Sequence, residues 1–219
     1  MELKLIKKYA LEARILFKAA IKSQLNLIDK SDDLIAKISK FGEEEVVEQA
    51  AYTWFNRLCA IRYLELNDKL PHGFRVLSHP LQTNAFQIVE NLEELTDEFN
   101  LDKSQVIELV LEGIHDEKLF RMALLGQCEQ LALGINQLFG EGTQWVNELL
   151  PCDLTRTKSI VRFVVDGLDE SFWRTLDVFN QLFSVYYADI KKELPKLDNS
   201  FKKKCFMTRR LLLQHLQKS

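Results

Sequence analysis

Apolar residues recur at helical spacing along most of the chain. Between residues 3 and 29 they form one continuous stripe, which predicts a long amphipathic helix. The same spacing predicts helices over residues 31–40, 43–68, 85–100, 103–113, 115–139 and 170–194, with shorter helices between Pro151 and Gly167. Gly42 ends the second helix, and we expect Gly140 to take a left-handed C-cap conformation.

The scarcity of turn-forming residues indicates the fold class. Eight Gly and four Pro are about 5% of the 219 residues, against roughly 12% in an average protein. A chain so poor in turn formers is poorly suited to the tight turns that join β-strands. We therefore predict an all-α protein, a single multi-helix bundle of about eight to ten helices. Its core should contain Trp54, Phe55, Leu58, Phe120, Leu131, Phe179 and Phe183.

Charge divides the chain into an acidic body and a basic tail. The formal net charge is −3. From Lys196 onward there are seven Lys or Arg residues and one Asp, a local charge of +6, which leaves −9 for residues 1–195. Pro195 ends the last helical pattern. We therefore take residues 1–194 as one helical domain and residues 195–219 as a basic C-terminal tail.

The first predicted helix has a basic back. Opposite its apolar stripe, within about 120° of arc, lie Lys4, Lys7, Lys8, Arg14, Lys18 and Lys22. Such side chains can bind DNA through its phosphates without reading its sequence, and an ordinary solvated helix face is the alternative explanation. The candidate phosphate contacts are Lys4, Lys8, Lys18, Lys22, Lys203, Arg209 and Arg210.

Neither a membrane span nor a secretory signal is present in the sequence. No apolar stretch approaches the roughly 18 residues that cross a bilayer, and the first residues lack the apolar core of a signal peptide. The four cysteines, Cys59, Cys128, Cys152 and Cys205, are far apart and form no C-x-x-C pair. We expect a cytoplasmic protein with reduced, mostly buried thiols and no membrane partner.

Residue patterns alone identify no catalytic, cofactor or metal site. The glycines of residues 139–143 follow a predicted helix, so they indicate a helix end and not a nucleotide-binding loop. The pair His115-Asp116 also resembles the metal-dependent HD phosphohydrolases, in which an upstream His and a later Asp complete the metal site. The further ligands would come from His72, His79, Asp153 and Asp166. A helix that starts at His115 is the simpler explanation, because carboxylates suit that end of the helix dipole.

The most distinctive stretch is residues 51–62, Ala-Tyr-Thr-Trp-Phe-Asn-Arg-Leu-Cys-Ala-Ile-Arg, which follows acidic residues 43–48. Its periodicity predicts an aromatic core helix whose Arg57 and Arg62 pair with carboxylates of neighbouring helices. The stretch resembles the N-terminal helical region of the PglX-type adenine-specific DNA methyltransferases of BREX phage-defence systems, and that of related fused restriction-modification enzymes. The signature residues are Tyr52, Trp54, Phe55, Asn56, Arg57 and Arg62. Fainter similarity continues through residues 119–139, 149–151 and 179–187 and covers most of residues 1–193.

The resemblance implies a much longer polypeptide, whose Rossmann-like domain binds S-adenosylmethionine and methylates adenine in DNA. The sequence contains neither the Asn-Pro-Pro-aromatic motif nor the glycine-rich turn of that domain. We therefore expect this chain to bind no cofactor by itself. It should be a non-catalytic N-terminal module, a fragment or truncated product, that supports the catalytic domain or holds DNA or another defence-system protein. The alternatives are a stand-alone helical interaction or regulatory protein and, less favoured, the HD-type phosphohydrolase. No pattern predicts an oligomeric state.

Overall fold

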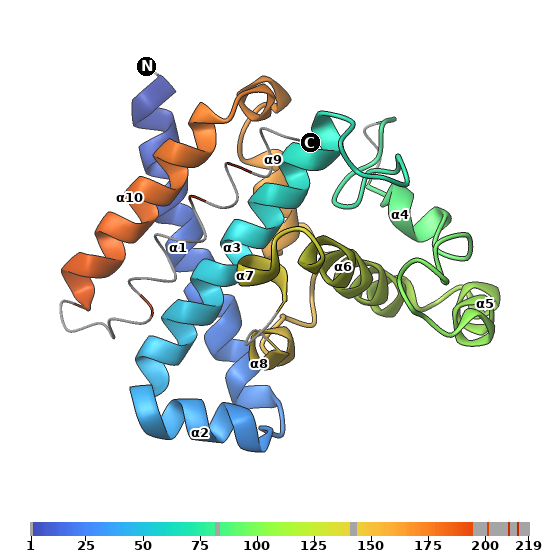
Figure 1. Cartoon of the computed structure of the whole chain (residues 1–219), viewed down its shortest axis with the longest axis horizontal. Helices are drawn as coiled ribbons and strands as arrows, with labels where there is room; N and C mark the ends of the chain where they lie inside the picture. The colour runs from blue at the N-terminus through green and yellow to red at the C-terminus, as the bar shows by residue number, and fades with distance from the viewer. Residues whose placement is uncertain are drawn as a thin grey trace.

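The computed structural model describes residues 2–81, 84–140 and 144–194, together with Phe201, Arg210 and Gln214. These residues form helices and connecting turns, and no β-strand occurs among them (Figure 1). The predicted all-α fold class is therefore confirmed. None of the described helices combines the length and the apolar character that a bilayer crossing requires.

Three helices at the start of the chain follow the predicted pattern. They are α1 (Glu2–Leu27), α2 (Asp32–Phe41) and α3 (Glu43–Leu66). The Ser31 hydroxyl caps α2 by accepting a hydrogen bond from the N–H of Leu34, at 3.2 Å. Gly42 joins α2 to α3 with a φ of 83°, a backbone conformation that side chains disfavour, so the chain changes direction between the two helices within one residue.

Helix α3 lies at the centre of the molecule. Nearly all of its residues after Glu45 are buried, which is typical of a helix that forms the core itself. Helices α1 and α10 (Asp177–Glu193) pack against it and against each other (Figure 1). Contacts elsewhere on α3 come from α7 (Asn136–Phe139), α8 (Gln144–Glu148), α9 (Ile160–Asp166) and the 3-10 helix η1 (Glu170–Arg174).

Aromatic rings connect the three long central helices. Phe55 of α3 lies edge-on to Phe17 of α1, with 5.5 Å between ring centroids, and stacks on Tyr186 of α10 at 4.9 Å. All seven residues predicted for the core are buried. Phe201 is also buried and lies edge-on to Tyr52, at 5.9 Å. Most of the predicted tail, residues 195–219, lies outside the described residues, so the division into domain and tail stays a prediction.

The prediction of one helix over residues 85–100 is wrong. Only α4 (Gln87–Glu90) is helical, and residues 91–100 form successive turns. The side chains of Asn91 and Thr96 donate hydrogen bonds to the backbone carbonyls of Gln87 and Glu93, at 2.8 and 3.1 Å. Side-chain bonds of this kind compete with the backbone ladder of a helix. The next predicted helix is confirmed as α5 (Lys103–Glu112).

Two further predicted helices are interrupted. The helix over residues 115–139 divides into α6 (Asp116–Ala132) and α7, because the N–H of Gly134 bonds to the carbonyl of Leu131 only three residues earlier. The last predicted helix begins with η1 before α10 starts. Gly140 has a φ of −109°, so the predicted left-handed cap at this residue is wrong.

Candidate functional site

The lysines that the sequence grouped on one face of α1 differ in exposure and in their ionic partners. Lys4 and Lys8 are exposed near the start of α1, and Lys8 lies 3.7 Å from Glu12. Lys22 is 64% exposed and 4.0 Å from Glu43. Lys18 is different, because its amino group lies 3.0 Å from a buried carboxylate, that of Glu48.

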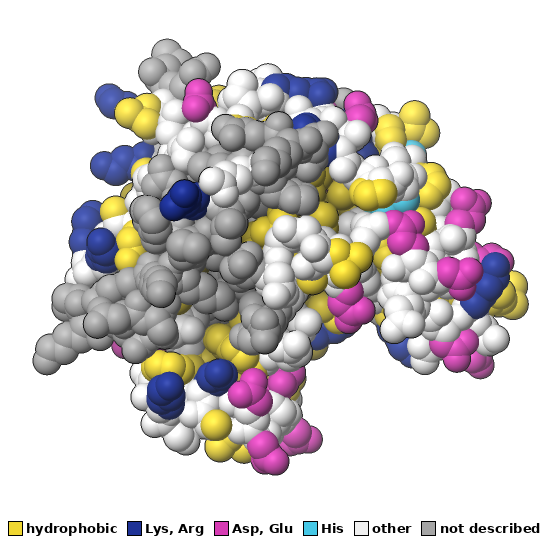
Figure 2. Space-filling view, viewed as in Figure 1, with side chains coloured by type: hydrophobic (Ala, Val, Ile, Leu, Met, Phe, Trp, Pro, Cys, Tyr) yellow, Lys and Arg dark blue, Asp and Glu magenta, His cyan; other side chains and the backbone are white. Residues whose placement is uncertain are grey.

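Arg14 contradicts the predicted basic back of α1, since it is 2% exposed and does not face solvent. Of the predicted tail contacts, Arg210 is exposed, whereas Lys203 and Arg209 lie outside the described residues. Figure 2 shows Lys and Arg side chains at the edge formed by α1 and α10, and Asp and Glu side chains gathered at the opposite edge, over α5.

The candidate metal residues have other partners in the structure. His115 lies 2.5 Å from Glu112, His79 lies 3.2 Å from Glu90, and His72 lies 2.6 Å from Gln127. Among the described residues, no group of three or more His, Cys, Asp or Glu side chains is placed to hold a metal ion.

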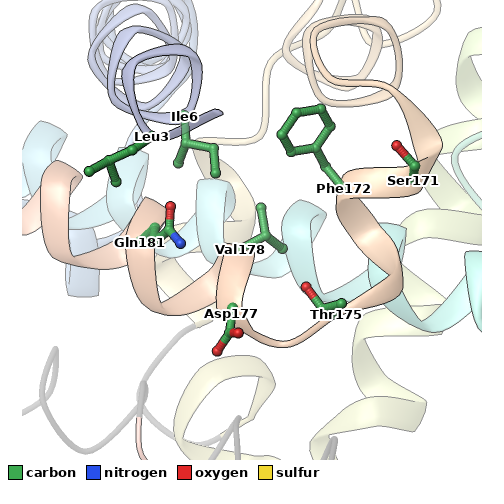
Figure 3. Close-up of a pocket in the computed structure, with 8 residues that line it drawn as sticks. All are labelled: Leu3, Ile6, Ser171, Phe172, Thr175, Asp177, Val178 and Gln181. Atoms are coloured by element: carbon green, nitrogen blue, oxygen red, sulfur yellow. The ribbon is translucent and has the colours of Figure 1, made fainter. Parts of the chain in front are cut away.

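A pocket of about 450 Å³ lies between the start of α1 and the segment that joins η1 to α10 (Figure 3). Leu3, Ile6 and Val178 give it an apolar wall, and Asp177 is the ionisable side chain of its lining. The Oε1 atom of Gln181 in the same lining is buried without a hydrogen-bond partner among the described atoms. A pocket with this lining suits an uncharged group better than a phosphate, because none of the described residues that line it is a Lys or Arg.

The described cysteines are free thiols. Cys59 and Cys128 are buried, and burial raises the pKa of both, in the case of Cys128 to about 11. Both are therefore protonated at neutral pH and chemically quiet, as the sequence predicts. Cys152 is exposed, and its sulfur donates to the side-chain oxygen of Gln24 at 3.0 Å. Cys205 lies outside the described residues.

The signature residues of α3 all point into the protein. None of the six is more than 4% exposed. Trp54 donates from Nε1 to the backbone carbonyl of Val146 at 2.8 Å, which ties α3 to α8. These side chains hold neighbouring segments in place and present no surface to a ligand.

Arg57 holds the end of α7 against α3. Its guanidinium donates to the backbone carbonyls of Leu138 and Phe139, at 2.9 and 3.3 Å, and to the side chain of Asn147 at 2.6 Å. It also lies over the Trp54 ring, 4.8 Å from the ring centroid. Burial lowers the pKa of Arg57 from its usual value, but a guanidinium stays charged at any physiological pH.

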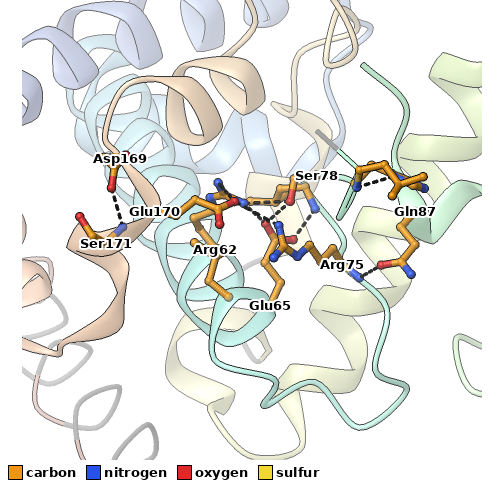
Figure 4. A network of polar contacts seen from close by, with 12 residues as sticks. Arg62, Glu65, Arg75, Ser78, Gln87, Asp169, Glu170 and Ser171 are labelled. Atoms are coloured by element: carbon orange, nitrogen blue, oxygen red, sulfur yellow. Dashed lines mark hydrogen bonds and ion pairs between the residues drawn. The ribbon is translucent and has the colours of Figure 1, made fainter. Parts of the chain in front are cut away.

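Arg62 and Glu65 form a second buried centre (Figure 4). Arg62 lies 2.6 Å from Glu65 and donates to the Ser78 hydroxyl oxygen at 2.8 Å. Its other terminal nitrogen lies 3.2 Å from Glu170 of η1, which Arg75 also contacts at 3.1 Å. The predicted pairing of Arg62 with a carboxylate of another helix is therefore confirmed.

Glu65 fixes the loop that follows α3. Its Oε2 atom accepts hydrogen bonds from the backbone N–H groups of Val76 and Leu77, at 2.8 and 2.7 Å. This buried carboxylate therefore accepts hydrogen bonds from two backbone N–H groups and from an arginine, which satisfy most of its acceptor positions. Residues 76–78 are consequently held against α3 although they belong to no helix.

A third centre joins α1, α3 and α10. Arg14 donates to both oxygens of Glu48, at 3.0 and 2.7 Å, and lies 2.7 Å from both Asp189 and Glu193. Lys18 completes this Arg14 network at 3.1 Å from Glu193. Burial by itself would lower the pKa of Arg14, but the hydrogen bonds to Glu48 and Glu193 outweigh burial and raise it. The hydrogen bond from Arg14 is the main reason that the pKa of Glu193 falls to about 2.

Sequence reasoning missed Glu48 and Glu65. Both are carboxylates without exposed surface on the buried helix α3, and each pairs with an arginine. Little in the sequence pointed to them, because α3 is buried on nearly every side and has no separate polar face that would mark which charged residues lie inside. A charged residue on a buried helix is almost always paired.

Comparison with known proteins finds two methyltransferases. The chain is 40% identical over 168 residues to an adenine-specific methyltransferase, BrxX, of Escherichia coli O9:H4 (strain HS). It is 24% identical over 199 residues to an adenine-specific methyltransferase, PglX, of Lacticaseibacillus casei (strain Zhang). These matches cover 76% and 83% of this chain but only 14% and 16% of the two relatives. No family model matches the chain. The resemblance to adenine-specific methyltransferases of this type is thus confirmed.

Glu48→Gln should destabilise the fold. The substitution removes the negative charge that faces Arg14 and Lys18 in a buried place, and the expected loss is roughly 3 kcal/mol of unfolding free energy in urea titrations. Glu12→Gln is the matched control, because Glu12 is 53% exposed and 3.7 Å from Lys8. Its effect should stay within about 0.5 kcal/mol. Equal stability of the two variants would contradict the importance assigned to Glu48.

The Arg14 network should also make the free energy of unfolding depend on pH in the acidic range. The folded-state pKa of Glu193, about 2, lies below the usual value of about 4.3 in an unfolded chain. The stabilisation is complete above pH 4.3 and is lost as pH falls toward 2, because the unfolded state then binds the proton more readily. Glu193→Gln should therefore reduce the fall in unfolding free energy between pH 5 and pH 2. An unchanged pH profile in the variant would contradict this assignment.

Proposed function

We propose that this chain is a non-catalytic helical module of a BREX-type adenine-specific DNA methyltransferase. The observation that carries the proposal is the 40% identity to BrxX over three quarters of this chain, which is matched by only 14% of the relative's length. A segment this small in relation to the relative represents one structural unit of it. Methyl transfer would then belong to other parts of the enzyme.

The all-helical fold favours a structural role over a catalytic one. S-adenosylmethionine domains of the Rossmann type place the cofactor at the ends of parallel strands, whereas the described residues form only helices and turns. The three buried polar centres, around Arg14, Arg57 and Arg62, hold the helices together as a stiff body. A stiff helical body is suited to holding the catalytic domain, DNA or a partner protein at a fixed position.

DNA contact is the finer part of the proposal. Lys4 and Lys8 are exposed near the start of α1, and Lys22 is also exposed. Lys18 is a weaker candidate, because Glu48 and Glu193 already neutralise it. These contacts would reach phosphates and would carry no sequence information.

A methyl-transfer assay tests the proposed division of labour. The chain alone, with labelled S-adenosylmethionine and duplex DNA, should transfer no label. The remaining part of the E. coli relative, expressed without the matched segment, should gain DNA methylation when this chain is added. The same mixture without the chain is the control. Methylation by the chain alone would overturn the proposal, and no gain on mixing would favour a stand-alone interaction protein.

Salt dependence tests the DNA contacts. If Lys4 and Lys8 each neutralise a phosphate, Lys4→Gln with Lys8→Gln should reduce the slope of log affinity against log salt by about 2. Lys118→Gln is the control, because Lys118 is exposed on α6, away from α1. Duplex binding with the same slope in the wild-type chain and in the double variant would exclude these lysines.

A further inference from the structure

Helix α5 is held to the molecule by one side only. It projects at the edge of the molecule far from α1 and α10 and contacts α6 (Figure 1). Val106 and Leu109 are its buried residues. Asp102 caps its first turn by accepting hydrogen bonds from the N–H groups of Ser104 and Gln105. The helix is therefore well formed locally although only a narrow stripe of it is packed.

A second apolar stripe on α5 faces solvent. Half-buried Ile107 lies with Val110 and Leu111 at i, i+3 and i+4, the spacing of a helix face that packs against another element, and Ile114 follows Gly113, which ends the helix in a left-handed conformation. Val110 is 47% exposed, and Leu111 and Ile114 are each 81% exposed. We call these four residues the outer face of α5. Large apolar side chains grouped in this way on a surface mark interaction sites more often than single exposed leucines do.

Strong negative charge surrounds the outer face. Residues 90–117 contain ten Asp or Glu and one Lys, a net charge of −9. All of these acids except Glu117 are exposed, and Figure 2 shows Asp and Glu side chains gathered over the α5 edge of the molecule. Glu108 and Glu112 follow Ile107 and Leu111 directly, so they border the apolar stripe on one side.

We propose that the outer face of α5 is a docking site for a partner protein segment that presents apolar side chains bordered by Lys or Arg. Apolar contact would provide most of the affinity, and the acidic border would select and orient a basic partner. Charge identifies the occupant. DNA is repelled by a surface of this sign, and a second copy of the chain would bring another nine negative charges to the same contact. The proposal is independent of the methyltransferase module proposed above.

A labelled helical peptide can serve as the probe. A synthetic 18-residue peptide with leucines on one face and lysines on the other reproduces the proposed chemistry (about five turns). Its binding to the full chain is measured by fluorescence anisotropy. Leu111→Ser with Ile114→Ser should weaken binding about tenfold, which corresponds to about 1.4 kcal/mol. Glu108→Gln with Glu112→Gln should flatten the decrease of affinity with salt.

Two controls separate docking from simple charge attraction. Leu133→Ser changes another exposed leucine, 90% exposed at the end of α6, and should leave binding unchanged. A peptide of the same composition with its order shuffled should bind at least tenfold more weakly. Equal binding by the Leu111 and Ile114 variant, or by the shuffled peptide, would overturn the proposal. Sedimentation that shows a dimer of the wild-type chain, lost in that variant, would assign the face to self-association and overturn it as well.

Discussion

Burial of α3 on every side is the constraint on which the rest of the structure depends. An ionised side chain inside a protein is costly unless an opposite charge or strong hydrogen bonds accompany it. Helix α3 carries Glu48, Arg57, Arg62 and Glu65 without appreciable exposure. Each of them therefore determines where its neighbours must lie, and the surrounding segments are arranged to supply these partners.

The hydrogen-bond and ionic partners of these α3 side chains come from segments that apolar packing alone would position poorly. The loop at residues 76–78 and the short helices α7 and η1 bury few side chains of their own, yet each is held by Glu65, Arg57 or Arg62. The long helices α1 and α10 share apolar packing and the Arg14 network. The described structure thus combines an aromatic centre with buried charged centres that tie the helices together, and the start of α1 and the projecting α5 are two of its exposed surfaces.

Local signals in the sequence predicted the first three helices, because their caps and apolar periods agree with one another, as at Ser31 and Gly42. They failed at residues 91–100, where side-chain hydrogen bonds override a reasonable apolar period. Arg14 was placed with the exposed lysines because it shares their arc on α1. What buries it is α10, which lies far away in the sequence, and no local pattern reports such a contact. The sequence predicted the helix α5, but it did not predict that the outer face of this helix is exposed.

The separation of Arg14 from Asp189, 175 positions along the chain, has a consequence for biosynthesis. Arg14 can meet Glu48 as soon as α3 has left the ribosome, but Asp189 and Glu193 emerge last among the described helices. At roughly 5 to 20 residues per second, the completed α1 and α3 wait about 6 to 25 seconds between the synthesis of Leu66 and that of Glu193, which completes the helix that closes over them. During that interval Phe17, Phe55 and the Arg14–Glu48 pair lack their final cover, and the nascent chain is most exposed to chaperones and to its neighbours.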